Sequence, residues 1–240
     1  TNQSNLQQNK KQIYQYKCDI CKDISFVVVD SKEGQPLMKR CKCFEMNKTK
    51  KLWDEAGIDM EQAKQTFTSF KEWNPSSINA KKKAIEYYQN FNTIRNERNN
   101  SIAFVGQVGS GKTHLSIAIA VNFLKKNISV VYMSYRDVIT KLKQNMIDEE
   151  YYQKELKKYK FADVLLIDDL FKGKVTESDI NIMFEIVNHR YMNNSPIIVS
   201  SEFPVYKLLD FDEAIGSRIL QMCKNYTIEI VGRDSNYRLK

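Results

Sequence analysis

One glycine-rich segment of eight residues constrains the fold of this 240-residue chain more than any other feature. It follows the pattern G-x-x-x-x-G-K-[ST] and consists of Gly106, Gln107, Val108, Gly109, Ser110, Gly111, Lys112 and Thr113. An apolar, strand-like run (102–105) precedes it, and a helical pattern (114–126) follows it. A glycine turn between a strand and a helix directs several backbone N–H groups at one point, where they can bind phosphates. The context therefore predicts a phosphate-binding loop for a nucleoside triphosphate.

Different groups of this loop are expected to bind different parts of the nucleotide. Backbone N–H groups surround the α- and β-phosphates, Lys112 reaches the β- and γ-phosphates, and the Thr113 hydroxyl takes one position on Mg²⁺. His114, the next residue, completes the predicted nucleotide-binding set. A chance match on an ordinary strand–turn–helix is the alternative.

A second motif lies about fifty residues further along the chain, where the apolar run Ala162–Ile167 ends in Asp168 and Asp169. Near-continuous apolar residues are typical of a buried parallel strand. Asp168 is predicted to hold Mg²⁺ beside Thr113, and Asp169 to orient or deprotonate the attacking water. Aspartate is shorter than the commoner glutamate at this second position, which predicts slow hydrolysis. A pair of helix-capping aspartates is the alternative interpretation.

Strand-like and helical patterns alternate across residues 96–240, the predicted core. Besides the run before the phosphate loop, strand candidates occupy 129–133, 162–167, 196–200 and 226–231. This alternation predicts an α/β fold with a doubly wound, parallel five-stranded sheet and its ligand at the carboxyl ends of the strands. Residues 52–95 are predicted to form a helical linker, with one short helix over 52–63 and a longer one with apolar positions from 78 to 94.

Four of the five cysteines gather in the predicted N-terminal module, residues 1–51. They are spaced Cys18-x2-Cys21 and Cys41-x-Cys43, with nineteen residues between the pairs. A strand at 25–29, a turn at 33–36 and a return over 37–40 form a hairpin that brings the pairs together. Two such pairs are typical of a tetrahedral Zn²⁺ site, which lets a segment fold that is too small to have its own core. Free or redox-active thiols are the alternative.

Charge and composition narrow the functional class. The chain has a formal net charge of +8, and residues 1–51 contribute eleven basic against five acidic side chains, or +6. A basic module favours contact with nucleic acid or an acidic partner, although a lysine-rich composition explains it equally well. No run of eighteen apolar residues exists, so no membrane contact is expected. The polar N-terminus is unlike a secretory leader, which predicts a cytoplasmic protein.

Together, the phosphate loop, the aspartate pair, the stretch Gly216-Ser217-Arg218-Ile219 and the segment 236–240 resemble the DnaC/DnaI/IstB group of AAA+ ATPases. The cysteine module is similar to the zinc-binding N-terminal domain of DnaI-like bacterial and phage helicase loaders. The resemblance covers residues 15–240. It implies an ATPase that uses ATP and Mg²⁺ to load a hexameric replicative helicase onto single-stranded DNA, as a homo-oligomer when ATP and DNA are bound.

The resemblance also implies roles for individual residues. Arg218 matches the arginine finger that reaches the γ-phosphate bound by a neighbouring subunit. We predict that Ser201 is the γ-phosphate sensor. Ser200 and Glu202 are its competitors for that position, and Arg238 matches a terminal arginine with no assigned role. Nine residues follow the last strand candidate, which predicts a core without the C-terminal helical lid of many AAA+ proteins.

Three other functions remain open from the sequence. The chain resembles IstB-like transposition helpers as well as helicase loaders. A small-molecule P-loop kinase needs an arginine-bearing lid after the second motif, and the short segment 172–174 is the nearest candidate for one. A nucleic-acid-binding protein that holds its nucleotide without hydrolysing it is disfavoured, because such a protein does not need a second carboxylate, Asp169, to act on water.

Overall fold

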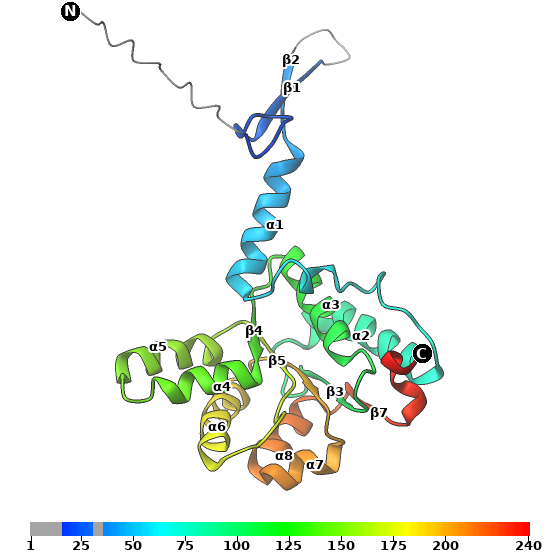
Figure 1. Ribbon diagram of the computed structural model, residues 1–240, viewed down its shortest axis with the longest axis vertical. Helices are drawn as coiled ribbons and strands as arrows, with labels where there is room; N and C mark the ends of the chain where they lie inside the picture. The colour runs from blue at the N-terminus through cyan, green and yellow to red at the C-terminus, as the bar shows by residue number, and fades with distance from the viewer. Residues whose placement is uncertain (1–15, 31–35) are drawn as a thin grey trace, which may run out of the picture. The chain divides into compact units, whose positions relative to one another are not determined.

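The computed structural model describes residues 16–30 and 36–240, and the chain divides into two compact units, Thr1–Lys50 and Lys51–Lys240. Figure 1 shows the elements of both units, which are described separately below. Helix α1 (Lys42–Ala56) runs across the boundary between them.

The second unit contains the predicted parallel five-stranded sheet, which confirms the doubly wound α/β fold. Its strand order is β4-β5-β6-β3-β7 and every pairing is parallel. The strands are β3 (Ile102–Gly106), β4 (Val130–Ser134), β5 (Val164–Asp168), β6 (Ile197–Ser201) and β7 (Thr227–Ile230). Because β5, β6 and β3 are neighbours and parallel, their carboxyl ends meet at one edge of the sheet. This edge carries the phosphate loop and the aspartate pair together.

Helices cover both faces of this sheet and produce three layers (Figure 1). Successive residues of a strand point to opposite faces. Ile102 and Phe104 of β3 therefore pack on the side of α2 (Pro75–Ile94) and α3 (Lys112–Lys125). Ala103 and Val105 pack on the other side. The helices of that side are α4 (Tyr135–Gln144), α5 (Glu149–Lys160), α6 (Glu177–Met192), α7 (Val205–Phe211) and α8 (Glu213–Met222).

The linker differs from its sequence prediction. The single helix predicted over 52–63 is wrong: α1 begins ten residues earlier, at Lys42, and ends at Ala56. Gly57 has a φ of +78°, a left-handed conformation that terminates helices and that glycine adopts readily. A short 3₁₀ turn, η1 (Gln62–Lys64), follows. Helix α2 begins as expected of its sequence, with Asn74 as the N-cap and Pro75 in the first turn.

The first unit is a small hairpin, with one cysteine pair before its first strand and the other pair after its second strand. β1 (Phe26–Asp30) pairs antiparallel with β2 (Pro36–Arg40), which confirms the two predicted strands. The predicted turn, 33–36, lies outside the described residues except for its last position. Since Phe26 is opposite Arg40, the segment before β1 and the segment after β2 lie side by side.

The segment after β7 forms two 3₁₀ turns, η2 (Arg233–Ser235) and η3 (Tyr237–Leu239). It is held against the phosphate loop, because the Tyr237 N–H donates to the Gly109 carbonyl at 3.0 Å. Asn74 at the start of α2 donates to the Ser235 hydroxyl at 3.0 Å. Linker, loop and C-terminal segment therefore form one contiguous surface. Among the described helices, none combines the length and apolar composition needed to cross a membrane.

Candidate nucleotide site

The glycines of the phosphate loop allow the chain to turn where a side chain does not fit. Gly106 ends β3 with a φ of +99°, and a Cβ there would lie 2.3 Å from the Ile230 carbonyl oxygen. Gly109 has a φ of +71°, and a Cβ there would lie 2.0 Å from Oδ1 of Asn236. Both positions require glycine for conformation and for space. The loop then leads directly into α3 at Lys112, so its N–H groups lie at a helix N-terminus.

Lys112 is a buried cation that the loop itself holds. Its Nζ donates to the carbonyl oxygens of Gly106 at 2.9 Å and Gln107 at 2.6 Å, and the residue is only 5% exposed. Burial lowers the pKa of Lys112 to about 8, opposed by the nearby carboxylates of Glu202 and Asp169. Stripping water from an ammonium without supplying a full negative partner leaves it able to bind an anionic phosphate strongly.

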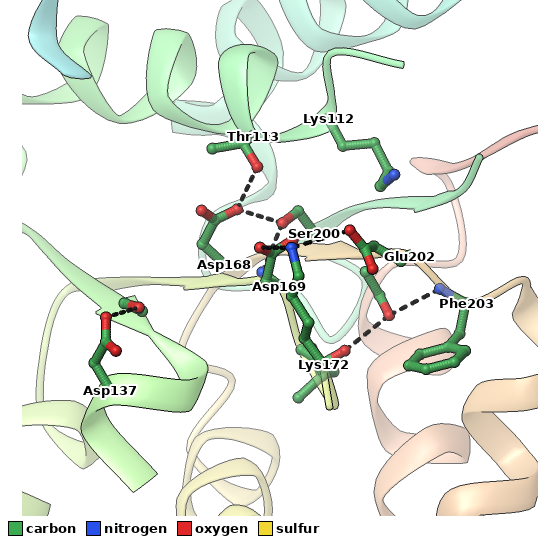
Figure 2. Close-up of polar contacts among 12 residues, drawn as sticks. Lys112, Thr113, Asp137, Asp168, Asp169, Lys172, Ser200, Glu202 and Phe203 are labelled. Atoms are coloured by element: carbon green, nitrogen blue, oxygen red, sulfur yellow. Dashed lines mark hydrogen bonds and ion pairs between the residues drawn. The ribbon is translucent and has the colours of Figure 1, made fainter. Parts of the chain in front are cut away.

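Thr113 and Asp168 lie together as the sequence predicts. The Thr113 hydroxyl donates to Oδ1 of Asp168 at 2.8 Å (Figure 2). Ser200, at the end of β6, donates to the same oxygen, and the Tyr132 hydroxyl donates to Oδ2 at 3.0 Å. Burial raises the pKa of Asp168 although these three hydrogen bonds favour its charged form. A hydroxyl beside a positioned carboxylate is a donor set that suits Mg²⁺.

Asp169 follows β5 in a left-handed conformation, with φ of +56°. Its backbone N–H donates to the Ser200 hydroxyl at 2.9 Å, which fixes the turn to β6. Its carboxylate forms an ion pair with Lys172 at 2.7 Å, and Lys172 also pairs with Glu202 at 3.0 Å. A positive φ in a non-glycine residue is uncommon and is found often at functional sites.

Lys112, Thr113 and the aspartate pair line a cleft of about 590 Å³, a size that suits a nucleotide. Its walls come from the phosphate loop, the ends of β5 and β6, the linker at 65–73 and the C-terminal segment. The phosphate loop contributes Gly109 to Thr113 together with His114, and the sheet edge contributes Asp168, Asp169, Lys172 and Glu202.

One side of the cleft is aromatic, which the sequence analysis missed. Phe70, Trp73 and Tyr237 line it, with ring centroids 5.7 Å apart for the first pair and 5.0 Å for Trp73 and Tyr237. Planar apolar rings opposite a cationic phosphate loop suit the base of a nucleotide. The sequence signal was weak, since two of the rings lie in the linker and the third, Tyr237, follows 164 residues after Trp73.

His114, Gln107 and Val108 belong to the predicted nucleotide-binding set, and their contacts within the protein differ. The His114 ring approaches the Thr66 carbonyl oxygen at 2.9 Å and the Ser69 hydroxyl at 3.3 Å, so it holds the linker against α3. Burial lowers its pKa. Gln107 accepts a hydrogen bond from Ser110 at 2.7 Å within the loop, and Val108 is exposed at its tip.

The geometry does not support Ser201 as the γ-phosphate sensor. Ser200 and Ser201 are both fully buried, but the Ser201 hydroxyl donates to the Leu170 carbonyl at 2.9 Å, because alternate residues of β6 face opposite sides of the sheet. Ser200 instead faces the aspartate pair, and Glu202 lines the cleft. The three candidates for the sensor position therefore have different surroundings: Ser201 faces Leu170, Ser200 faces the aspartate pair, and Glu202 lines the cleft.

Arg218 is absent from the described residues that line the cleft, whereas Arg238 lines it. Arg218 lies on α8, where its Nε donates to Asn188 at 3.1 Å and its guanidinium lies 5.3 Å from the Phe184 ring centroid. A residue that serves a neighbouring subunit has to lie away from its own nucleotide, and this placement meets that requirement. Arg238 lies beside Tyr237 at the aromatic side.

In the first unit, the four predicted zinc ligands converge. The sulfur atoms of Cys18, Cys21, Cys41 and Cys43 all lie within 4.8 Å of one another. The Sγ atoms of Cys18 and Cys41 are 3.8 Å apart, and those of Cys21 and Cys43 are 3.3 Å apart. Four thiolates around one tetrahedral Zn²⁺ have sulfur–sulfur distances of about 3.8 Å, calculated from Zn–S bonds of about 2.3 Å. The cluster therefore fits a single zinc ion.

Sequence comparison places this site among ATP-binding proteins. Residues 47–240 match the family of IstB-like ATP binding proteins. The chain is 39% identical over 211 residues to the uncharacterized protein YqaM of Bacillus subtilis (strain 168), covering 84% of this chain and 66% of YqaM. It is 36% identical over 235 residues to the phage-like element PBSX protein XkdC of that strain, covering 94% of this chain and 87% of XkdC.

More distant similarities extend to insertion sequences and to replication proteins. An ATP-binding protein of insertion sequence IS232 from Bacillus thuringiensis subsp. berliner is 28% identical over 147 residues, covering 60% of this chain and 58% of that protein. The crystal structure of the DnaC helicase loader matches with a TM-score of 0.61 and 24% identity, covering 72% of this chain and 100% of that chain. The DnaI structure matches with a TM-score of 0.60 and 22% identity, covering 72% and 95%. These two structures share the fold of this chain.

Proposed function

The chain belongs to the family of IstB-like ATP binding proteins, a group of AAA+ ATPases, and on this premise we propose that it loads a ring helicase onto single-stranded DNA. ATP binding and hydrolysis act as the switch in this proposal. The observation that carries it is the nucleotide cleft, which is closed on one side by linker residues. The occupancy of the cleft can therefore act directly on the segment that leads to the cysteine-bearing unit.

In this proposal, the residues of the two sequence motifs bind the phosphates, the metal ion and the attacking water. The loop N–H groups and Lys112 bind the phosphates, while Thr113 and Asp168 hold Mg²⁺. Magnesium, when bound, neutralises charge on the phosphate oxygens. Asp169 orients the water whose oxygen bonds to the γ-phosphorus as the bond to the bridging oxygen breaks, which yields ADP and phosphate. Tyr132 and Ser200 hold the Asp168 carboxylate in place.

Arg218 is proposed to complete the site of a neighbouring subunit. A guanidinium is permanently charged and forks onto phosphate oxygens, which suits it to a γ-phosphate. Its position on α8, outside the lining of its own cleft, favours this role in trans among the described residues. The active ATPase is then a homo-oligomer formed with ATP and single-stranded DNA.

The four-cysteine cluster is proposed to bind one Zn²⁺ and to stabilise the hairpin unit. Of the residues described there, only Cys21 and Cys41 are buried apolar residues, so the hairpin has little core of its own. Zinc coordination would supply the folding free energy that such a unit lacks.

A transposition helper is the second candidate, because the family contains insertion-sequence ATPases. The extent of the matches favours the loader. The IS232 protein matches 60% of the chain, whereas XkdC matches 94%, which has to include most of the cysteine-bearing unit. The match to XkdC therefore extends beyond the length of chain that the insertion-sequence protein matches, and for this reason we rank the loader first.

Affinity capture tests the proposal. Full-length tagged protein, incubated with ATP, should retain a purified hexameric replicative helicase, and single-stranded DNA should stimulate its ATP hydrolysis. If the tagged protein retains a transposase in the presence of duplex target DNA but does not retain the helicase, the transposition helper is favoured. Hydrolysis with neither stimulation nor partner would refute the loader.

A further inference from the structure

Lys172 lies between two carboxylates at the γ-phosphate end of the cleft. Its Nζ is 2.7 Å from Oδ2 of Asp169 and 3.0 Å from Oε1 of Glu202. Figure 2 shows the Lys172 side chain extending towards these two carboxylates, next to the Thr113–Asp168–Ser200 group. All three residues line the cleft. Neither the phosphate loop nor the aspartate pair includes Lys172 or Glu202.

Buried neighbours and hydrogen bonds hold the backbone that leads into Lys172. Leu170 and Phe171, which separate it from Asp169, are fully buried. The Leu170 N–H donates to the Ser200 carbonyl at 2.8 Å, and the Lys172 N–H donates to the Asp169 carbonyl at 3.0 Å. The Lys172 side chain is 42% exposed, compared with 33% for Asp169 and 25% for Glu202. A long, half-exposed side chain on a rigid turn can exchange partners at little cost.

The ion pair also affects what Asp169 can do. The Lys172 ammonium donates to Oδ2 of Asp169 at 2.7 Å and so occupies one of the lone pairs with which this carboxylate could bind a water molecule. Aspartate has a short side chain, so a carboxylate held towards Lys172 is poorly placed to turn towards a water beside the γ-phosphate. Glu202 provides the ammonium with a second carboxylate at a similar distance.

We propose that Lys172 inhibits hydrolysis by pairing with Asp169, and that Glu202 relieves the inhibition by accepting Lys172 as its alternative partner. The proposal rests on the role of Asp169 in orienting water, given above. It makes the ATPase slow until the ammonium leaves Asp169. The phosphates of ATP favour that departure, since they compete with the carboxylates for the cations that line the cleft, which are Lys71, Lys112, Lys172 and Arg238.

Variants of the two partners should therefore act in opposite directions. Lys172→Met keeps the side-chain length and removes the charge, so kcat without DNA or helicase should rise about fivefold, the scale of a partly exposed ion pair. Its KM for ATP should rise as well, because a cation is lost from the cleft. Glu202→Gln removes the alternative partner, so kcat should fall about twofold while KM falls. The double variant Lys172→Met/Glu202→Gln should keep the raised kcat of Lys172→Met.

Steady-state phosphate release by the full-length protein measures these effects. Lys172→Arg keeps the charge and should therefore have a lower kcat than Lys172→Met, and Lys174→Met, at an exposed lysine two residues away, serves as the matched control. A Lys172→Met kcat that is unchanged or lower would overturn the inhibitory pair, as would a Glu202→Gln kcat that rises. Wild-type hydrolysis by Asp169→Asn would instead refute the role of Asp169, so the two failures are distinguishable.

Discussion

Lys112 destabilises the nucleotide-free protein, and its replacement by methionine should increase the free energy of unfolding. Burial lowers the pKa of Lys112 from 10.5 to about 8. A change of this size corresponds to about 3 kcal/mol at neutral pH. Lys112→Met removes that penalty but loses the two hydrogen bonds to the Gly106 and Gln107 carbonyls, worth about 1 kcal/mol each. The expected net gain is about 1 kcal/mol, or an increase in Tm of about 2–4 °C.

The gain should depend on pH in one direction. Between about pH 8 and pH 10.5 the unfolded chain retains the Lys112 proton while the folded protein loses it. The unfolded state binds more protons in this window, so the contribution of Lys112 to the free energy of unfolding of the wild-type protein rises with pH there. The methionine variant has no such group. Its advantage over the wild type should therefore shrink as the pH rises through this window.

Thermal unfolding of the full-length protein without nucleotide measures both effects, at about pH 7 and about pH 9.5. Lys125→Met, at an exposed lysine in the last turn of α3, is the matched control. With saturating Mg²⁺ and ATP, Tm should rise for the wild type and the control, and stay constant for Lys112→Met. A methionine variant that is less stable than the wild type at pH 7, by an amount independent of pH, would refute the reasoning.

Three further predictions concern the remaining parts of the molecule. Asp169→Asn should bind ATP with wild-type affinity and hydrolyse none, measured by nucleotide titration and phosphate release; turnover at the normal rate would contradict its assignment. Trp73→Ala should weaken ATP binding about tenfold through loss of an aromatic wall, whereas an unchanged Kd would place the base elsewhere. Elemental analysis should find one zinc per chain, with chelation unfolding the hairpin unit while ATP binding by residues 51–240 persists; metal-free protein with four titratable thiols would rule this site out.

The phosphate loop and the aspartate pair could be predicted from the sequence because each is a short local motif. The parallel sheet then brings the two motifs together at one edge. Thr113 and Asp168 are 55 residues apart, yet their side chains form a hydrogen bond because β3 and β5 flank β6 in one parallel sheet. The cysteine cluster was predictable for a similar reason, since a hairpin brings its two ends together.

The sequence could not identify contacts that depend on how the sheet orients neighbouring residues. Ser200 and Ser201 are adjacent and chemically identical, and only the alternation of β6 decides that Ser200 faces Asp168 while Ser201 is turned to Leu170. The aromatic wall was missed because it joins the linker to a segment far away in the chain. Helix α5 was also missed: its mostly charged sequence gives a weak apolar pattern, and only Leu156 and Tyr159 are buried.

The proposed arginine finger predicts assembly across subunits, which complementation can test. Lys112→Ala supplies an intact Arg218 but binds no nucleotide, whereas Arg218→Ala binds nucleotide and lacks the finger. The mixture should hydrolyse ATP although neither variant does so alone, with each single defect costing a factor on the order of 10³. If no mixing ratio restores hydrolysis, Arg218 does not act in trans.

Loading on closed circular single-stranded DNA tests the central claim most directly, because a ring helicase cannot thread onto a molecule without ends. The number of helicase hexamers per circle would be measured with ATP, the partner helicase and either the wild-type protein or Lys112→Ala. We expect the wild-type protein to increase helicase occupancy on the circles and Lys112→Ala to leave it at the level of helicase alone. Equal occupancy with and without the wild-type protein would contradict the loader function.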